Sequence, residues 1–168
     1  GKYYKKNEDF EATIAVDRND IEDDRLGIYN TQSQMAGESA GELNGDIIND
    51  LKNNAFTEQC MDGQYFYDTD HPVGKASASN KGTTALSVAS LAAAQASYGA
   101  ARQAIMELVD EEGAKLNLVP NLLEVPPALE AVAKILLEND KFQDDSPNPY
   151  QGTARVKVNP ALTSSTGP

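Results

Sequence analysis

The sequence predicts an α+β fold, because runs of alternating apolar residues occur together with runs in which apolar residues recur every three or four positions. Residues 10–16 and 153–158 alternate in the way of half-buried strands. Residues 31–55, 83–112 and 128–140 follow the period of amphipathic helices. A chain of 168 residues is long enough for one domain, or for two small lobes around a shared core.

The first two predicted elements are the strand at 10–16 and the helix at 31–55. The apolar side chains of the helix are spaced mostly by four positions: Met35, Leu43, Ile47, Ile48, Leu51 and Ala55. Three glycines interrupt this helix and weaken it, each by up to ~1 kcal/mol relative to alanine, so tertiary packing must hold it. We therefore expect its apolar face to pack against sheet residues such as Ile14 and Phe66.

A hairpin is predicted next, from two short runs at 56–61 and 64–68 that are joined by Asp62-Gly63, the dipeptide of a type I′ turn. In the simple register, Cys60 faces Tyr65. His71 then lies beyond the strand, in a turn before a proline, so Cys60 and His71 are expected at opposite ends of the hairpin. The small residues at 73–82 predict a flexible loop.

The second half of the chain is predicted to contain two helices and two strands. Thr83 or Thr84 caps an alanine-rich helix that Gly113 closes. Residues 115–127 form a strand interrupted at a proline, and Pro127 is the first residue of the last helix. The buried face of this helix consists of Leu129, Val132, Ala133, Leu136 and Leu137. Residues 153–158 are the final strand.

Composition excludes several classes of function. The chain has 14 Lys and Arg against 26 Asp and Glu, a formal net charge of −12, which repels phosphate backbones and anionic lipid surfaces. We expect neither sequence-specific binding of nucleic acid nor a membrane span, since no window approaches the ~18 apolar residues that a span needs. The single cysteine excludes an internal disulfide and fits a reducing compartment. The chain begins without methionine and ends in a polar tail, so we expect a fragment of a longer polypeptide.

One stretch, CMDGQYFYDTDHPVG at 60–74, holds the only cysteine and the only histidine of the chain. Zinc would need three or four Cys or His ligands, which the chain lacks. A hard metal would need Asp62, Asp68, Asp70 or the Asp23-Asp24 pair, but the spacing is not that of a calcium loop, and clustered Asp and Gly first of all form turns. A Cys60–His71 nucleophile and base would have to meet across a hairpin of eleven residues. We therefore favour an acidic turn over either site. The sequence identifies no catalytic, metal or cofactor-binding residues, no cofactor and no residues of a subunit interface.

Three stretches, taken in order, resemble a known family. They are KKNEDFEATIAVDRNDIEDDRLGIY, CMDGQYFYDTDHPVG and KLNLVPNLLEVPPALEAVAKILLEND, at 5–29, 60–74 and 115–140. Together they resemble the major head subunits, or major capsid proteins, of Mu-like phages and prophages. That family is similar in fold to the Hong Kong 97-type capsid proteins.

The resemblance implies an α+β, Hong Kong 97-like fold with a peripheral P-domain, built on a long spine helix and a sheet, and an axial A-domain. It assigns residues 1–29 to the returning E-loop or a P-domain strand, 30–82 to the spine helix and hairpin, and 83–168 mainly to an incomplete A-domain. It also implies that the N-terminal arm, half of the E-loop and the C-terminal part of the fold are absent from this chain.

The implied function is that of a capsid subunit, which is not an enzyme and which assembles with copies of itself, as hexamers and pentamers, into an icosahedral shell around DNA. Scaffold and portal proteins are further partners that the resemblance allows. The implied location is the virion capsid, and the bacterial host cytoplasm before release. Two alternatives stay open from the residues alone, an acidic-site metal-dependent hydrolase and a monomeric binding module. A hydrolase would require one concave pocket with convergent carboxylates.

Overall fold

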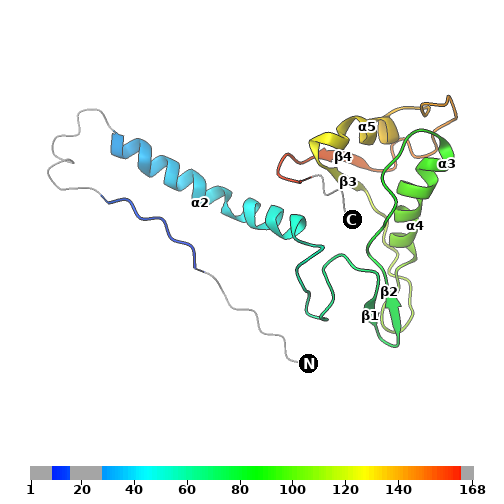
Figure 1. Ribbon diagram of the computed structural model, residues 1–168, viewed down its shortest axis with the longest axis horizontal. Helices are drawn as coiled ribbons and strands as arrows, with labels where there is room; N and C mark the ends of the chain where they lie inside the picture. The colour runs from blue at the N-terminus through cyan, green and yellow to red at the C-terminus, as the bar shows by residue number, and fades with distance from the viewer. Residues whose placement is uncertain (1–8, 16–27, 164–168) are drawn as a thin grey trace. The chain divides into compact units, whose positions relative to one another are not determined.

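The computed structural model describes residues 9–15 and 28–163 and is shown in Figure 1. The chain divides into two compact units, Gly1–Asp50 and Leu51–Pro168, which are described separately. Its α+β content agrees with the predicted class: helices lie in both units, and short paired strands lie in the second. No helix of the described residues is long and apolar enough to cross a membrane.

The long helix α2 spans Ile28–Asn53, close to the predicted 31–55. Its predicted apolar face, however, is not buried. No side chain from 30 to 50 is buried, and Ile47 and Leu51 remain 36% and 51% exposed. The predicted partners Ile14 and Phe66 are themselves exposed. Apolar side chains four residues apart give the helix a face that another element could bury, but they do not specify that element. None of the described residues of the first unit buries this face.

The predicted strand at 10–16 is wrong as far as it can be followed. Residues 9–15 form no strand, Phe10 and Ile14 are exposed, and Val16 lies outside the described residues. Alternation sets which side chains share a face, but a strand also needs a neighbour for its backbone hydrogen bonds. Residues 9–15 have no such neighbour among the described residues.

The Asp62-Gly63 turn exists with a different geometry and register. Only Gly63 has positive φ, at +87°, whereas a type I′ turn requires it at both central residues. The Gly63 N–H donates to the Cys60 carbonyl at 3.1 Å, and the Cys60 N–H donates to the Gln64 carbonyl at 2.7 Å. A turn over 60–63 closed by a left-handed glycine results, and it pairs Gln59, not Cys60, with Tyr65. The runs at 56–61 and 64–68 share that single bridge and are not strands.

Part of the predicted loop at 73–82 is an ordered hairpin. Strand β1 (His71–Val73) pairs antiparallel with β2 (Ala76–Ala78), and Val73 lies opposite Ala76. Gly74 makes the turn with φ +60°, and a Cβ atom there would lie 2.9 Å from the Glu111 carbonyl oxygen. The close backbone approach and the left-handed conformation together explain why glycine occupies this position.

The alanine-rich helix is shorter than predicted and contains an irregular turn. It begins at Ser90, whose hydroxyl accepts from the Ala93 N–H, and not at Thr83 or Thr84. Three consecutive segments follow without a break: α3 (Leu91–Ala94), the π-helical η1 (Gln95–Gly99) and α4 (Ala100–Glu107). Gly113, with φ +86°, closes a turn over 110–113 instead of this helix. The π segment turns Ser97 and Tyr98 inward, and both are buried.

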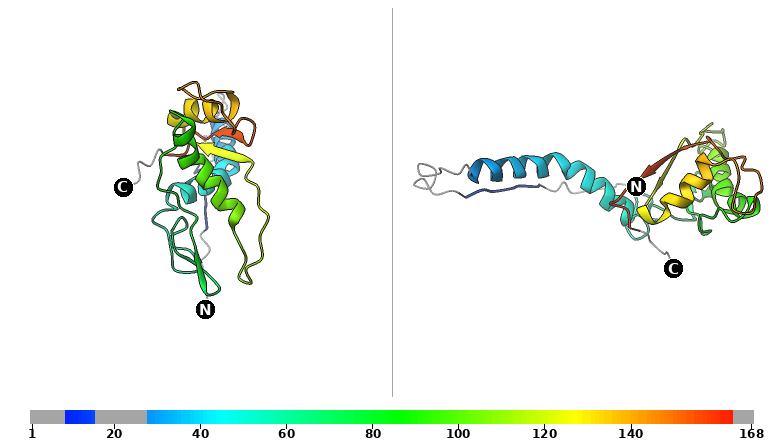
Figure 2. Two further views of the ribbon diagram at one scale, coloured as in Figure 1. Left: turned by 90° about the vertical axis from the view of Figure 1, so that its right-hand side faces the viewer. Right: turned by 90° about the horizontal axis from the view of Figure 1, so that it is seen from above.

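The core of the second unit is a β-α-β arrangement. Strand β3 (Leu122–Val125) pairs in parallel with β4 (Arg155–Val158), and η2 (Pro127–Leu129) and α5 (Glu130–Glu138) lie between them in the chain. Helix α5 packs along this strand pair (Figure 2). Residues 115–121 form no strand and contribute one isolated bridge, so the predicted strand at 115–127 is confirmed only after its proline. The last helix, with Pro127 at its first position, and the last strand are confirmed.

The hydrophobic core joins α5 to the alanine-rich helix and two loops. Its buried members are Val88, Ala94, Tyr98, Leu136, Leu137 and Phe142. Asn148 closes the C-terminal end of α5: its amide donates to the Leu136 and Asn139 carbonyls at 2.8 Å each, while its side-chain oxygen accepts from the Tyr150 N–H at 2.9 Å. Carbonyls that a helix end leaves without partners are thereby satisfied inside the protein.

Gly99 has a packing role that predicts a measurable effect. A Cβ atom at Gly99 would collide with the Tyr150 hydroxyl, and the Tyr150 ring is held edge-on against Tyr98 with centroids 5.2 Å apart. We expect Gly99→Ala to lower the free energy of unfolding by ~1–3 kcal/mol through overpacking, measured by urea denaturation. Gly41→Ala in α2 is the control, since nothing lies within 4 Å of its Cβ position, and it should be neutral or stabilising. Equal effects of the two substitutions would contradict this packing role.

Candidate functional site

The loop that precedes β1 is closed by an ion pair between His71 and Asp62. Nδ1 of His71 lies 2.7 Å from Oδ2 of Asp62, and both side chains are largely covered. The bond to Asp62 is the main cause that raises the pKa of His71 above its ordinary value, while burial acts in the opposite direction. The same bond, followed by the Gln64 N–H, lowers the pKa of Asp62. Nε2 of His71 is buried and has no hydrogen-bond partner of normal geometry among the described residues, although Asn80 and the Phe66 carbonyl also favour the protonated ring.

This pairing corrects the predicted separation of Cys60 and His71. The chain folds back after Gly63, so the imidazole reaches Asp62, two positions from Cys60, instead of lying at the far end of the hairpin. The Cys60 thiol is half-buried, and no hydrogen bond joins it to the imidazole in the part of the chain that the structure describes. The structure therefore brings His71 together with Asp62 and not with the cysteine.

The other acidic side chains of this stretch serve as turn residues. The Asp68 carboxylate accepts from the backbone N–H groups of Thr69 at 2.8 Å and Tyr65 at 3.2 Å, and these bonds contribute to lowering its pKa. Asp70 accepts from the Gln64 side chain at 3.2 Å. Asp23 and Asp24 lie outside the described residues. Among residues 9–15 and 28–163, no group of three or more His, Cys, Asp or Glu side chains could hold a metal ion.

The His71–Asp62 pair predicts a pH dependence that a single NMR signal can follow, because the chain has one histidine. A raised pKa means that the pairing stabilises the loop fully below the ordinary value of 6.5, and that this stabilisation is lost as pH rises through the raised value. We expect Asp62→Asn to move the His71 pKa back toward 6.5 in an imidazole titration. Asp70→Asn is the control in the same loop, because Asp70 bonds to Gln64 and not to His71. An unchanged titration in Asp62→Asn would show that the pair does not form.

A second polar cluster, which sequence reasoning missed, surrounds Glu124 on β3. Nζ of Lys52 lies 2.6 Å from one carboxylate oxygen, and Nζ of Lys157 lies 3.0 Å from the other. The Asn159 amide also donates to the carboxylate at 2.9 Å. These donors, Lys52 first, lower the pKa of Glu124 from 4.5 to about 2. The sequence held one signal that could have pointed to Lys52: it is the only basic residue of α2.

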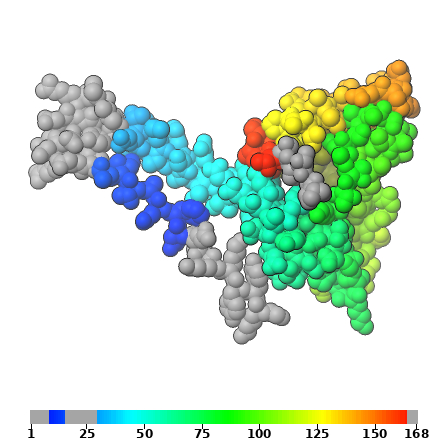
Figure 3. Space-filling view, in the orientation of Figure 1, coloured from blue at the N-terminus to red at the C-terminus, as the bar shows by residue number. Residues whose placement is uncertain are grey.

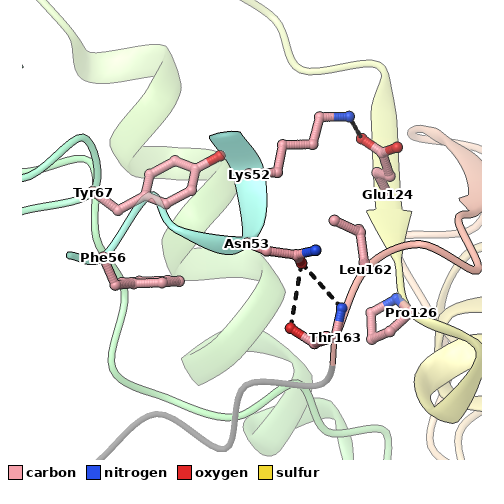
Figure 4. Close-up of a pocket in the computed structure, with 8 residues that line it drawn as sticks. All are labelled: Lys52, Asn53, Phe56, Tyr67, Glu124, Pro126, Leu162 and Thr163. Carbon is pink, nitrogen blue, oxygen red and sulfur yellow. Dashed lines mark hydrogen bonds and ion pairs between the residues drawn. The ribbon is translucent and has the colours of Figure 1, made fainter. Parts of the chain in front are cut away.

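A pocket of about 230 Å³ opens beside this cluster, and Figure 4 shows the eight residues that line it. They are Lys52, Asn53, Phe56, Tyr67, Glu124, Pro126, Leu162 and Thr163. Asn53 fastens the chain that forms one side of the pocket: its amide donates to the Ala161 carbonyl at 2.9 Å, and its side-chain oxygen accepts from the Thr163 N–H at 3.0 Å. Glu124 is the only carboxylate among the lining residues, so the pocket lacks the convergent carboxylates that a hydrolase would require.

Two exposed surfaces of the second unit differ in charge. The aromatic-lysine face borders the pocket and consists of Lys52, Phe56, Phe66, Tyr67 and Lys81. The acidic tip is the turn over 110–113, which presents Glu111 and Glu112, and it is followed by three exposed aliphatic side chains, Leu116, Leu118 and Val119. In Figure 3, the segment that carries the face is coloured teal to green. Both surfaces leave apolar side chains exposed to solvent beside charged ones.

Comparison with solved structures identifies the fold. The chain resembles the chain in "Bacteriophage JBD30 capsid" with a TM-score of 0.79 and 22% identity, covering 92% of this chain and 74% of that one. It also resembles the chain in "Procapsid of bacteriophage JBD30" with a TM-score of 0.65 and 23% identity, covering 91% and 75%. The protein therefore has the α+β, Hong Kong 97-like fold of phage capsid proteins, as predicted.

Comparison with sequence families gives the membership. Residues 1–91 and 84–162 match the family described as "Mu-like prophage major head subunit gpT", and the chain belongs to this family. The resemblance stated from the sequence is thus confirmed.

Two curated relatives are similar over part of the chain. One is the major capsid protein of Escherichia phage Mu, 44% identical over 71 residues, which is 42% of this chain and 23% of the relative. The other is the Mu-like prophage FluMu major head subunit of Haemophilus influenzae, 43% identical over 61 residues, which is 36% of this chain and 20% of the relative. The matched part of the chain thus spans less than a quarter of the length of each relative.

Proposed function

We propose that the protein is a structural subunit of a phage or prophage head, and that copies of it assemble into the icosahedral shell that encloses DNA. The observation that carries this proposal is the family match over residues 1–91 and 84–162 together with the capsid fold. The net charge of −12 is consistent with a shell that contains DNA without binding it tightly. The site of action is the virion capsid, reached from the bacterial host cytoplasm, and no catalytic step is part of this function.

The proposal extends to the domains and partners. Residues 1–29 belong to the E-loop return or a P-domain strand, 30–82 to the P-domain spine helix and hairpin, and 83–168 mainly to the A-domain. Support comes from α2, whose 26 residues make it long enough for a spine helix, and from the β-α-β core of the second unit. The partners are further copies in hexamers and pentamers, with scaffold and portal proteins during assembly.

The hydrolase and binding-module alternatives are not supported. In the described residues, the carboxylates around His71 accept hydrogen bonds from the imidazole or from nearby turn groups, and the pocket is lined by a single carboxylate already bound to Lys52. An acidic metal site would need several such groups turned toward one point.

Assembly of the full-length protein tests the proposal. Identical chains with a net charge of −12 repel each other over about 10 Å at 0.1 M salt, and added salt screens this repulsion. We expect light scattering of the full-length protein to rise with salt, and electron microscopy to show rings or shells, while the 168-residue chain alone stays a monomer or small oligomer in low salt. A full-length protein that remains monomeric at high concentration and high salt would overturn the proposal.

A further inference from the structure

The aromatic-lysine face offers cations and aromatic rings to a partner. The Phe56 and Phe66 rings pack on Tyr67 with centroids 5.3 and 5.2 Å apart, and Phe66 is 54% exposed. Nζ of Lys81 lies 5.4 Å from the Phe56 ring centroid and makes no ion pair within the described part of the chain. Lys52 makes one ion pair, to Glu124, and its ammonium has two further donors.

The acidic groups nearest to this face have backbone or side-chain donors of their own. Glu124 is shared by Lys52, Lys157 and Asn159, and Asp68 accepts from two backbone N–H groups. The Lys81 ammonium lies close enough to Asp68 to contribute to lowering its pKa, but no hydrogen bond joins the two side chains. The ammonium groups of Lys52 and Lys81 therefore keep hydrogen-bond donors that can bind a partner. A suitable partner carries carboxylates for these lysines and apolar side chains for the aromatic rings.

The acidic tip carries those groups in a preformed turn. Oδ1 of Asp110 accepts from the N–H groups of Glu112 and Ala114 at 2.9 Å each, and the Asp110 N–H donates to the Ala114 carbonyl at 2.9 Å. Gly113 supplies the left-handed residue, and Gly74 packs against the Glu111 carbonyl from the neighbouring hairpin. A turn that is already ordered loses little conformational entropy on binding.

The tip also forms no ion pair within the part of the chain that the structure describes. The carboxylates of Glu111 and Glu112 make no ion pair with any residue from 9–15 or 28–163. Lys115, the nearest cation in sequence, donates to the Glu107 carbonyl at 3.3 Å. Val119, in the extended segment after the turn, is 66% exposed. No ion pair joins tip and face among the described residues of one copy, and their opposite charges make a second copy a fitting partner for each.

We propose that the acidic tip of one copy docks on the aromatic-lysine face of a second copy, with Glu111 and Glu112 beside Lys81 and Lys52, and with the aliphatic side chains after the turn against the Phe56 and Phe66 rings. This inference rests on the proposed shell function and names one contact within it. The two surfaces are different, so the contact is heterologous, and its repetition generates a closed ring or an open chain.

Disulfide trapping tests the geometry directly in the full-length protein. The 168 residues contain one cysteine, so Cys60→Ser, together with replacement of any cysteine in the rest of the full-length protein, gives a background without cysteine. Lys81→Cys combined with Glu112→Cys should then give dimers and higher oligomers on oxidation, since a disulfide forms only when the two Cα atoms come within ~7 Å. Lys141→Cys combined with Glu112→Cys is the control pair, at an exposed lysine away from the face. Equal trapping by both pairs, or none by the first pair in assembled protein, would overturn the contact.

Charge exchange tests the same contact without a covalent bond. We expect Glu111→Lys with Glu112→Lys, or Lys81→Glu alone, to raise the protein concentration needed for assembly, by roughly tenfold for the double variant. Combining all three changes should restore most of the loss, whereas adding Lys141→Glu to the double variant should not. These positions are exposed, so thermal midpoints should stay unchanged.

The outcomes separate the two proposals. A parent protein that assembles, with charge variants and cysteine pairs that behave like their controls, would overturn the contact and leave the shell function standing. A parent protein that never assembles at any salt concentration would overturn both.

Discussion

Leu136→Ala should lower the free energy of unfolding by ~2–5 kcal/mol. Leu136 lies on α5, has no exposed surface, and is the largest fully buried side chain of the described residues. It packs in the cluster that also contains Val88, Tyr98 and Phe142. Removing three carbon atoms there leaves a cavity between α5 and the alanine-rich helix, because the surrounding side chains relax only in part.

Urea denaturation of the parent and the variant measures this loss. Leu122→Ala is the matched control, because it makes the same chemical change on β3 at a side chain that is 48% exposed. We expect the control to cost well under half as much, since most of its surface stays in water in both states. Losses of similar size at the two positions would mean that α5 does not form the centre of the core.

The last helix was predictable from sequence because its signals are local and agree with one another. Pro127 sets the first turn, and the apolar positions that follow have a helical period and a matching buried face. Ala133, Leu136 and Leu137 are buried as predicted, and Leu129 and Val132 are half-buried. A helix can be predicted without tertiary information when helix propensity, the residue at its start and the spacing of its apolar residues all agree.

The elements that were predicted wrongly depend on what lies across from them. The apolar face of α2 has the required spacing, but Ile47 and Leu51 remain 36% and 51% exposed. The alternation at 10–16 likewise required a neighbouring strand. The alanine-rich helix begins at Ser90 and not at the predicted Thr83 or Thr84, because Ser and Thr can both cap a helix and the sequence alone does not show which residue does so.

The residues of the candidate site could be predicted from the sequence only in part, because their pairing also depends on tertiary structure. Cys60, Asp62 and His71 were singled out by rarity and clustering, yet which of them pair depends on the register of a single turn. Lys52 and Glu124 are 72 residues apart, and nothing local links them. Only the pairing of β3 with β4 brings Lys157 to the same carboxylate.

The carboxylate of Glu124 connects the last turn of α2 to the strand pair, and its ionisation makes this connection dependent on pH. Its side chain is 18% exposed, so solvent screens its contacts only in part. Because its pKa in the folded protein is about 2 and its ordinary value is 4.5, the ionised form is favoured by folding. Because Lys157 is 55% exposed and solvent screens its charge, that difference corresponds to a contribution of roughly 2–3 kcal/mol, present above pH 4.5 and lost as pH falls toward 2.

Glu124→Gln should therefore destabilise the protein most at neutral pH, by roughly 2–3 kcal/mol, and the gap between parent and variant should close as pH falls from 4.5 toward 2. The amide keeps the shape of the side chain but leaves Lys52 and Lys157 without their shared anion. Glu130→Gln is the matched control, because the Glu130–Lys134 pair on α5 is exposed to solvent and should contribute little to stability at either pH. Denaturation curves at pH 7 and pH 3 measure this gap. A gap of the same size at both pH values would mean that the charge of Glu124 does not stabilise the fold through its bonds to Lys52 and Lys157.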